Sequence, residues 1–452
     1  MYTIKRHIAP VVERRARNSK IPSWNGSIVV YSKKDNIVWK DMKMKHIITL
    51  LAAPVILFTG CGYAETKTDM IASSEITTEN SLQTTEQDIT AGLVYDESSN
   101  TWSTDNEKYK KFVNIMYKEC FEEPEIRGTY LLATDDEIIF IGGINGTDIN
   151  GNKVDACTTY EIGSITKTFT ATAVFQLCER GVLSLDDTLD KYFPQYEYGK
   201  DITIDMLLRM QSGLRREFLG FDEQNIDMEV FKKYYNDGFT DEELLSELFS
   251  SEPECEPGTE IRYSNAGYTL LAMIIEQVTG GSYADYIQKN IFDVCGMEHS
   301  SSMTIGDVTS VPEPVPDGTY PFSFGEVFDS PYDICINTAR GAGDIHSCCA
   351  DLLRFDRALI GGKLINEDSL ARMFDMGERT PGKVNYGCGW MSSAMDANAC
   401  EHTGGTPSYM SGNLYMKSEK YGNIYLIQLH SSYTDGNYYA KCVKSIITAA
   451  KY

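Results

Sequence analysis

The segment Glu161-Ile-Gly-Ser-Ile-Thr-Lys-Thr-Phe-Thr-Ala171 places a serine and a lysine one helical turn apart. Residues three positions apart lie on the same face of a helix, so the amine of Lys167 can lie beside the hydroxyl of Ser164 and take its proton. The same spacing also fits a structural arrangement, in which Ser164 caps the helix and Lys167 is solvated on the first turn. The segment by itself leaves a nucleophile and a helix cap equally open, so the decision depends on the rest of the chain.

The charge of the chain excludes one large class of partners. The 452 residues include 41 Lys and Arg against 65 Asp and Glu, a formal net charge of −24 at pH 7. Residues 1–60 carry a net +8, so the remainder carries −32. A nucleic-acid-binding protein needs a basic face, whereas an acidic protein repels polyanions. We therefore expect no nucleic-acid partner.

A short apolar run near the start is typical of an export signal. Lysines after Met42 lead into fourteen mostly apolar residues, 47–60, and the run is followed by Cys61 in the sequence Phe-Thr-Gly-Cys. About 20 residues are needed to span a bilayer, whereas a shorter run after positive charges indicates a signal peptide. The last four residues resemble a bacterial lipobox, whose cysteine carries the lipid. We expect residues 42–60 to be a lipoprotein signal peptide with lipidation at Cys61; the alternative is a short uncleaved anchor.

The segments on either side of this signal carry two further expectations. Signal peptides begin near the start codon, so we expect residues 1–41 to be a mis-assigned upstream segment, with translation beginning at Met42 or Met44. Downstream, the sequence up to about residue 92 is rich in Thr, Ser and Glu and poor in apolar residues. Such a composition does not bury enough apolar surface to fold. We expect residues 61–104 to be a disordered tether.

The cysteines and acidic loops do not indicate a metal or cofactor site. Eleven cysteines follow Cys61, without a C-x-x-C pair or a Cys/His cluster at zinc spacing, and an odd number leaves at least one unpaired. We expect most of them to be small buried apolar side chains, with disulfide pairing left open. Asp148, Asn150 and Asn152 alternate as in a calcium loop, but Lys153 stands where that loop needs glycine. No metal and no cofactor is expected.

Residues 105–452 carry strand patterns at both ends and helical patterns between them. Strands are expected within 128–141 and over 409–417 and 422–430, and helices over 109–120, 164–180, 204–210, 241–249, 268–278, 282–291, 349–359, 367–373 and 438–450. Apolar residues cover most of the surface of the helix at 164–180, which indicates a buried central helix. The order predicts one α+β domain whose sheet is completed by the C-terminal part.

Two later motifs complete a set of candidate catalytic groups. A hydroxyl nucleophile needs a base, a proton carrier for the leaving group, and donors for the oxyanion. Tyr263-Ser-Asn265 and His402-Thr-Gly-Gly405 follow the Ser-x-x-Lys motif in that order. Together the three motifs resemble those of the serine β-lactamase-like family, which includes class C β-lactamases, D-alanyl-D-alanine peptidases and related esterases. Intervening segments such as Leu-Ser-Leu-Asp-Asp-Thr-Leu-Asp and Leu-Leu-Arg-Met-Gln-Ser-Gly-Leu resemble family segments too, and the similarity covers about residues 105–450.

The resemblance implies a fold and a role for each motif residue. The fold is an antiparallel sheet flanked by helices, formed by about 105–180 and 385–452, with an all-helical subdomain over about 181–384. The implied nucleophile is Ser164, assisted by Lys167, with Tyr263 as proton shuttle. Tyrosine acts as a base near pH 7 only if cations lower its pKa, a role expected of Lys167 and His402. The remaining implied contacts are substrate binding by Asn265, His402, Thr403 and Gly404, and an oxyanion hole from the N–H groups of Ser164 and Gly405.

His402 distinguishes this chain from class C β-lactamases, which usually have lysine at that position. Histidine is partly neutral at pH 7, so a peptidase or esterase is favoured over an efficient β-lactamase. We expect a serine hydrolase of D-alanyl peptides that works through an acyl-enzyme and is held by its lipid on the extracytoplasmic face of a bacterial membrane. The substrate is expected to be a small molecule or a peptidoglycan peptide. The alternatives are a carboxylesterase, a weak β-lactamase, and a non-enzymatic penicillin-sensing or wall-binding lipoprotein.

Overall fold

The computed structural model describes residues 89–121, 127–148, 151–219, 239–302, 339–377, 384–406, 409–431 and 437–452. All of them belong to one unit, Thr78–Tyr452. The expected upstream segment, the signal peptide, Cys61 and the tether up to residue 88 lie outside the described residues. In the described part of the chain, no helix is long and apolar enough to cross a membrane.

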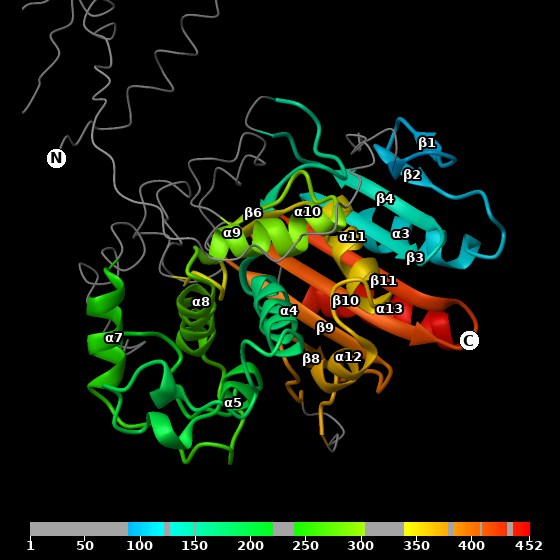
Figure 1. Ribbon diagram of the computed structural model, residues 1–452. Coiled ribbons are helices and arrows are strands. Elements are labelled where there is room, and N and C mark those ends of the chain that lie inside the picture. The colour runs from blue at the N-terminus through cyan, green and yellow to red at the C-terminus, as the bar shows by residue number, and fades with distance from the viewer. Residues whose placement is uncertain are drawn as a thin grey trace, which may run out of the picture. The chain divides into compact units, whose positions relative to one another are not determined.

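An eight-stranded antiparallel sheet is formed by strands from both ends of the unit (Figure 1). Its order is β1-β2-β4-β3-β11-β10-β9-β8, so the N-terminal hairpin of β3 and β4 pairs with the C-terminal strand β11. This confirms that the C-terminal part completes the sheet. The strands are β1 Val94–Asp96, β2 Thr101–Ser103, β3 Gly128–Thr134, β4 Ile138–Ile144, β8 Met391–Ser392, β9 Ala399–Gly405, β10 Met410–Ser418 and β11 Gly422–His430.

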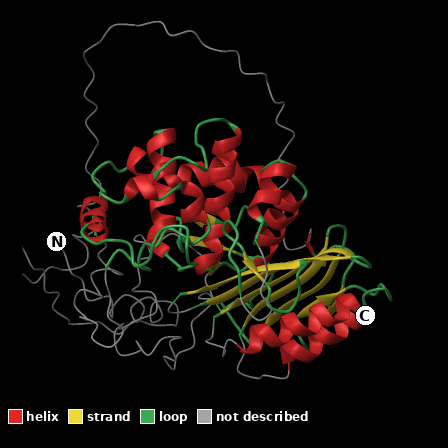
Figure 2. Cartoon of the chain, turned by 90° about the horizontal axis from the view of Figure 1, so that it is seen from below, coloured by secondary structure: helices red, strands yellow, loops and turns green. Residues whose placement is uncertain are grey.

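Both faces of this sheet are buried. Successive side chains along a strand point to opposite faces, so one strand contributes to the apolar core on each side. On β3, Tyr130 and Leu132 join one apolar cluster, whereas Leu131 and Ala133 join the other. The face that carries Tyr130 and Leu132 is covered by two helices, α3 Lys110–Phe121 and α13 Asn437–Lys451. The other helices lie on the opposite face of the sheet (Figure 2).

Helix α4, Thr166–Glu179, is the buried central helix that the sequence predicts, since every residue from Thr166 to Leu177 is buried. It packs against α8, α9 and α12. The helices around it are α5 Ile204–Leu208, α7 Asp241–Phe249, α8 Asn265–Thr279, α9 Tyr283–Ile287, α10 Asp293–Cys295, α11 Cys349–Ile360 and α12 Glu367–Met373, with a π-helical turn Gln288–Phe292 between α9 and α10. Ser164 stands at the start of this central helix.

Capping residues fix the ends of the helices near the site. Thr240 and Glu243 form a reciprocal capping box at the start of α7, which satisfies backbone donors that the first turn leaves free. Ser264 caps α8 by accepting from the Gly267 N–H at 3.0 Å. Gly280 ends α8 in a left-handed conformation, φ +70°, a backbone that glycine adopts without steric cost. The N-terminal residues of α8 are therefore fixed in place by a cap.

Two expected boundaries are wrong. Strands β1 and β2 lie within the expected tether, and β2 pairs with β4, so the folded domain begins before residue 105. The region 181–384 is not all helical, because β6 Ser301–Ser302 and β7 Ile345–Ser347 join β5 Tyr160–Glu161 in a second sheet of order β5-β7-β6. Both sets of strands are too short for an alternating pattern to be recognised in the sequence.

The described cysteines form no disulfide. Five of these nine are buried and four are half-buried. Most of the described cysteines are therefore buried, as the sequence predicts.

Candidate active site

Ser164 lies in a tight turn between β5 and α4. The turn, Gly163–Ile165, is a single 3₁₀ turn that leads directly into the helix. Gly163 has φ +49°, and a Cβ atom there would lie 2.8 Å from the backbone nitrogen of Gly405. Only glycine fits such an approach of two backbones. The sequence Gly-Ser therefore brings the serine next to the end of β9.

Lys167 lies beside the serine in a dry environment. Its Nζ is 3.0 Å from Ser164 Oγ and donates to the carbonyl oxygen of Ala342 at 2.6 Å. The side chain is fully buried, and burial lowers the pKa of the amine well below its ordinary value; Arg216 adds to this effect, while Glu217 and Asp344 oppose it. A neutral amine has a lone pair for the serine proton. The neutral amine of Lys167 is thus placed next to the Ser164 hydroxyl, where it can take the serine proton.

Tyr263 lies close to Ser164 and Lys167, but its pKa is not lowered as expected. Lys167 Nζ is 4.9 Å from the centre of its ring, and its hydroxyl interacts with Ser164. Burial raises the pKa of Tyr263 above its ordinary value, although Ser164 and Arg216 oppose the shift. The expectation that Lys167 and His402 lower this pKa is therefore wrong. Tyr263 is a neutral phenol, which can donate a proton.

His402 is buried in the same cluster with both ring nitrogens engaged. Nε2 is 2.9 Å from the hydroxyl of Tyr386, and Nδ1 is 2.7 Å from the carbonyl oxygen of Thr403. Burial, with a smaller effect of Lys167, lowers the pKa of His402 to about 3. Nδ1–H therefore donates to the carbonyl, and Nε2 accepts from the tyrosine. His402 provides no positive charge near pH 7, which corrects the expectation of a partly charged histidine.

The backbone around Gly404 and Gly405 meets the start of the Ser164 turn. A Cβ atom on Gly404 would lie 2.0 Å from the Ile162 carbonyl oxygen and 2.9 Å from the Ser164 nitrogen. Ser411 on β10 holds the same carbonyl by donating to it at 2.7 Å. Gly405, by contrast, is exposed. The two expected oxyanion donors, the N–H groups of Ser164 and Gly405, thus lie on neighbouring segments at an open edge.

Asn265 begins α8, two residues after Tyr263. Its Nδ2 donates to Glu217 Oε1 at 2.6 Å, whereas its buried Oδ1 has no hydrogen-bond partner among the described residues. Buried polar atoms without partners carry a desolvation cost, and such an oxygen can accept from a ligand N–H. This geometry suits the amide-binding role that the sequence resemblance implies.

Several groups of the cluster were not found by sequence reasoning. Tyr386 occurs in Asn-Tyr-Gly-Cys-Gly-Trp390, where a Cβ on Gly389 would lie 2.8 Å from the Lys167 carbonyl oxygen. The Ala342 carbonyl occurs in Arg-Gly-Ala-Gly-Asp344, whose Gly341 has φ +73°. In both cases the signal was a glycine-rich stretch. Glu217 has no comparable signal. In the described part of the chain, no group of three His, Cys, Asp or Glu side chains is placed to bind a metal.

The site has the arrangement of a serine hydrolase: a serine lies beside a buried neutral lysine, with a tyrosine phenol and two backbone donors nearby. Residues 116–439 match the family model Beta-lactamase, so the chain belongs to the Beta-lactamase family. It is a β-lactamase-related, penicillin-binding-protein-like serine hydrolase.

Two curated relatives come from Bacillus subtilis (strain 168). Penicillin-binding protein 4* is 29% identical over 319 residues, which cover 66% of this chain and 67% of the relative. PbpX is 31% identical over 282 residues, covering 61% and 65%. The matches thus span about two thirds of each relative's length.

Solved structures share the fold. A penicillin-binding protein from Bacillus halodurans superposes with a TM-score of 0.61 at 20% identity, covering 74% of this chain and 99% of that one. D-amino acid amidase from Ochrobactrum anthropi SV3, solved with D-phenylalanine, gives a TM-score of 0.57 at 21% identity, covering 76% and 99%. The α+β fold expected from the sequence is therefore confirmed.

Proposed function

We propose that this serine hydrolase cleaves D-alanyl peptides as a DD-carboxypeptidase. The observation that carries the proposal is the 3.0 Å approach of Lys167 Nζ to Ser164 Oγ inside a buried environment. Lys167 takes the serine proton while Oγ attacks the carbonyl carbon of the scissile amide. The N–H groups of Ser164 and Gly405 then hold the oxyanion; losing one such donor typically costs about 10²- to 10³-fold in rate.

The neutral phenol of Tyr263 suits the second half of acylation. The leaving amine needs a proton, and the Tyr263 hydroxyl donates it as the C–N bond breaks. Lys167, protonated in the first half and 4.9 Å from the centre of the Tyr263 ring, returns a proton to Tyr263. Water then releases the acyl group from Ser164 by the same groups in reverse. Asn265 Oδ1 accepts from an amide N–H on the acyl side.

A charged group for the terminal carboxylate of a peptide is available beside Tyr263. The guanidinium of Arg216 lies 5.3 Å from the centre of the Tyr263 ring, and its side chain is 65% exposed. Glu217, 3.5 Å away, compensates part of this charge. Arg216 therefore supports a substrate with a terminal carboxylate. The exposed Arg216 would hold this carboxylate less firmly than a lysine at position 402 would.

A carboxylesterase is the second candidate. The observation that favours it is the neutral, fully engaged His402, because a small acyl ester has no carboxylate that needs a cation. A β-lactamase ranks below both for the same reason.

One labelling experiment separates these activities. The full chain and a Ser164→Ala control are incubated with a fluorescent penicillin and with a fluorophosphonate probe. A stable penicillin adduct on the wild type alone supports the peptidase, and release of D-alanine from a D-alanyl-D-alanine peptide supports it further. Labelling by the fluorophosphonate alone favours the esterase. Absence of labelling by both probes would overturn the proposal.

We also propose that the protein is a lipoprotein on the extracytoplasmic face of a bacterial membrane, anchored at Cys61. The support is the sequence of residues 42–61, with lysines, a short apolar run and Phe-Thr-Gly-Cys. Labelled fatty acid should enter the wild type in cells and not Cys61→Ser. Peptides from residues 1–41 in the mature protein would contradict the expected start at Met42 or Met44.

A further inference from the structure

The second sheet brings three reactive side chains to one of its ends. Tyr160 pairs with Ser347 across β5 and β7, and Ser301 pairs with His346 across β6 and β7. In antiparallel pairing, the chain before Tyr160 and the chain before Ser301 both run alongside the chain after Ser347. The Ala350 N–H accordingly donates to the Ala156 carbonyl oxygen at 3.0 Å. Cys157, His299 and Cys348 therefore meet at this end.

The side chains of Cys157, His299 and Cys348 interact at this end of the sheet, with Cys157 between the other two. Hydrogen bonds from Cys348 and then from His299 lower the pKa of the Cys157 thiol, against the opposing effect of burial. The same contact with Cys157 raises the pKa of His299, and burial raises the pKa of the Cys348 thiol. A sulfur that accepts from an imidazole and a thiol has thiolate character. Cys157 is therefore the nucleophilic sulfur, with a protonated thiol next to it.

Two carboxylates, those of Asp351 and Asp155, hold this group in register. Asp351 accepts from the His299 N–H at 2.8 Å and from the Ser300 hydroxyl at 2.8 Å. The Cys157 N–H donates to Asp155 Oδ1 at 2.9 Å. The proposed hydrolysis at Ser164 uses none of these groups, so the cluster needs a separate explanation.

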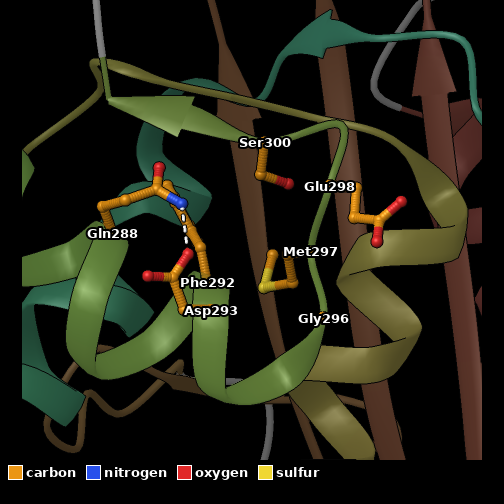
Figure 3. A pocket seen from close by; sticks show the side chains of 7 residues that line it. All are labelled: Gln288, Phe292, Asp293, Gly296, Met297, Glu298 and Ser300. Carbon is orange, nitrogen blue, oxygen red and sulfur yellow. Dashed lines mark hydrogen bonds between the residues drawn. The ribbon is translucent and has the colours of Figure 1, made fainter. Parts of the chain in front are cut away.

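Small solutes can reach this part of the molecule. Cys157 and His299 are both half-buried. A surface hollow of about 580 Å³ lies next to the cluster, and both sequence neighbours of His299, Glu298 and Ser300, line it (Figure 3). Cys349, by contrast, is buried and donates to the Thr129 carbonyl oxygen at 3.5 Å. Cys349 therefore serves as a matched control for its neighbour Cys348.

We propose that Cys157 and Cys348 are a peroxide-reactive pair that closes to a disulfide. The Cys157 thiolate attacks the O–O bond of a hydroperoxide, forming a sulfenic acid as the alkoxide or hydroxide leaves and takes a proton. The Cys348 thiol then attacks the sulfenic sulfur, the S–S bond forms, and water leaves. In sum, two thiols and one hydroperoxide give one disulfide, one alcohol or water, and one further water.

The test is peptide mapping of the full chain after treatment with one equivalent of hydrogen peroxide. We expect a linked peptide pair containing Cys157 and Cys348, lighter by two hydrogen atoms than the separate peptides. The link should persist in Cys349→Ser and in Ser164→Ala, and should be absent from Cys348→Ser, which should instead accumulate sulfenic acid at Cys157. Without peroxide, iodoacetamide should alkylate Cys157 faster than the half-buried Cys178 and Cys255, with a pH midpoint below the ordinary thiol value of about 8.5.

His299→Gln tests the role of the imidazole. Loss of the imidazole hydrogen bond should slow alkylation of Cys157 at pH 7 by about tenfold, because the thiolate fraction falls. The proposal is overturned if peroxide leaves Cys157 and Cys348 reduced, if Cys157 links to another cysteine, or if Cys157 is alkylated no faster than Cys178. These readouts do not depend on hydrolase activity, so they remain informative whether or not the proposed peptidase function is correct.

Discussion

The hydroxyl of Tyr386 lies 2.9 Å from Nε2 of His402, at the back of the cluster that contains Lys167 and Tyr263. The ring of Tyr386 also packs edge-on against that of Tyr263, with centres 6.0 Å apart. His402 thus works as a neutral hydrogen-bonding element that holds a tyrosine. The positive charge that lysine supplies at this position in class C β-lactamases is absent near neutral pH.

Replacing Tyr386 by phenylalanine removes this hydrogen bond and keeps the ring contact with Tyr263. The buried Nε2 of His402 then lacks its partner, a cost of about 1 to 3 kcal/mol in the free energy of unfolding. Denaturant unfolding of Tyr386→Phe measures this loss. Stability equal to the wild type would show that the hydrogen bond does not hold His402.

Glu161 provides a pH-dependent contribution to stability. Burial, opposed by a hydrogen bond with Thr406, raises the pKa of this carboxyl to about 7 from an ordinary value of 4.5. Because this pKa is higher in the folded than in the unfolded state, the contribution of Glu161 to stability is complete below pH 4.5. The contribution is lost as the pH rises through 7.

Glu161→Gln should remove this loss. Between pH 4.5 and 8, the free energy of unfolding of the wild type should fall by on the order of 3 kcal/mol relative to the variant, as follows from the raised pKa of Glu161. Thermal unfolding of both proteins across that range measures the difference. Parallel curves, or a wild type that gains stability over the variant as the pH rises, would refute the assignment.

Gly404 and Gly405 should differ sharply in their tolerance of alanine. A Cβ atom at Gly404 meets the Ile162 carbonyl oxygen at 2.0 Å, whereas at Gly405 the nearest heavy atom is the Met410 sulfur at 3.4 Å. Gly404→Ala should displace the Ser164 turn, reducing penicillin acylation by roughly 10²-fold or more, the loss expected when an oxyanion donor moves. Gly405→Ala keeps its backbone N–H and should stay within a few fold of the wild type; similar rates for both variants would contradict this geometry.

Asn265→Ala should separate amide-bearing substrates from plain esters. Its Oδ1 is a buried acceptor without a partner among the described residues, and helix α8 keeps its Ser264 cap. We expect kcat/KM to fall about tenfold for an acyl group with an amide N–H, as for one lost hydrogen bond of roughly 1.5 kcal/mol. The fluorophosphonate rate should not change. Equal losses with both reagents would indicate general damage to the site.

Two helices with side-chain caps are predicted to the residue from the sequence. Asp241–Phe249 and Glu367–Met373 match the predicted bounds, because the capping residues Thr240 and Asn366 mark where each begins. Strand β9 was not predicted, since Glu-His-Thr-Gly-Gly lacks alternating apolar residues and contains two glycines. Pairing with β10 on one side and β8 on the other stabilises this strand.

The sequence motifs predicted which residues gather at the site, but not their protonation. Ser164, Lys167, Tyr263 and His402 lie together, although Tyr263 and His402 are distant from the serine in the chain. Their charge states follow from burial, which depends on the packing of α4 and β9 and cannot be inferred from a motif. The partner of His402, Tyr386, carries no motif of its own apart from the glycines beside it.

The central claim is that Lys167 is a neutral base for Ser164, and the pH dependence of acylation tests it most directly. The rate at which a fluorescent penicillin or fluorophosphonate acylates Ser164 should reach its plateau well below pH 10, because burial lowers the pKa of Lys167 well below its ordinary value. Lys167→Arg should reduce the plateau by roughly 10²- to 10⁴-fold, as for loss of a general base. A rate that rises up to about pH 10, as for an ordinary lysine, or one that Lys167→Arg leaves unchanged, would contradict the account.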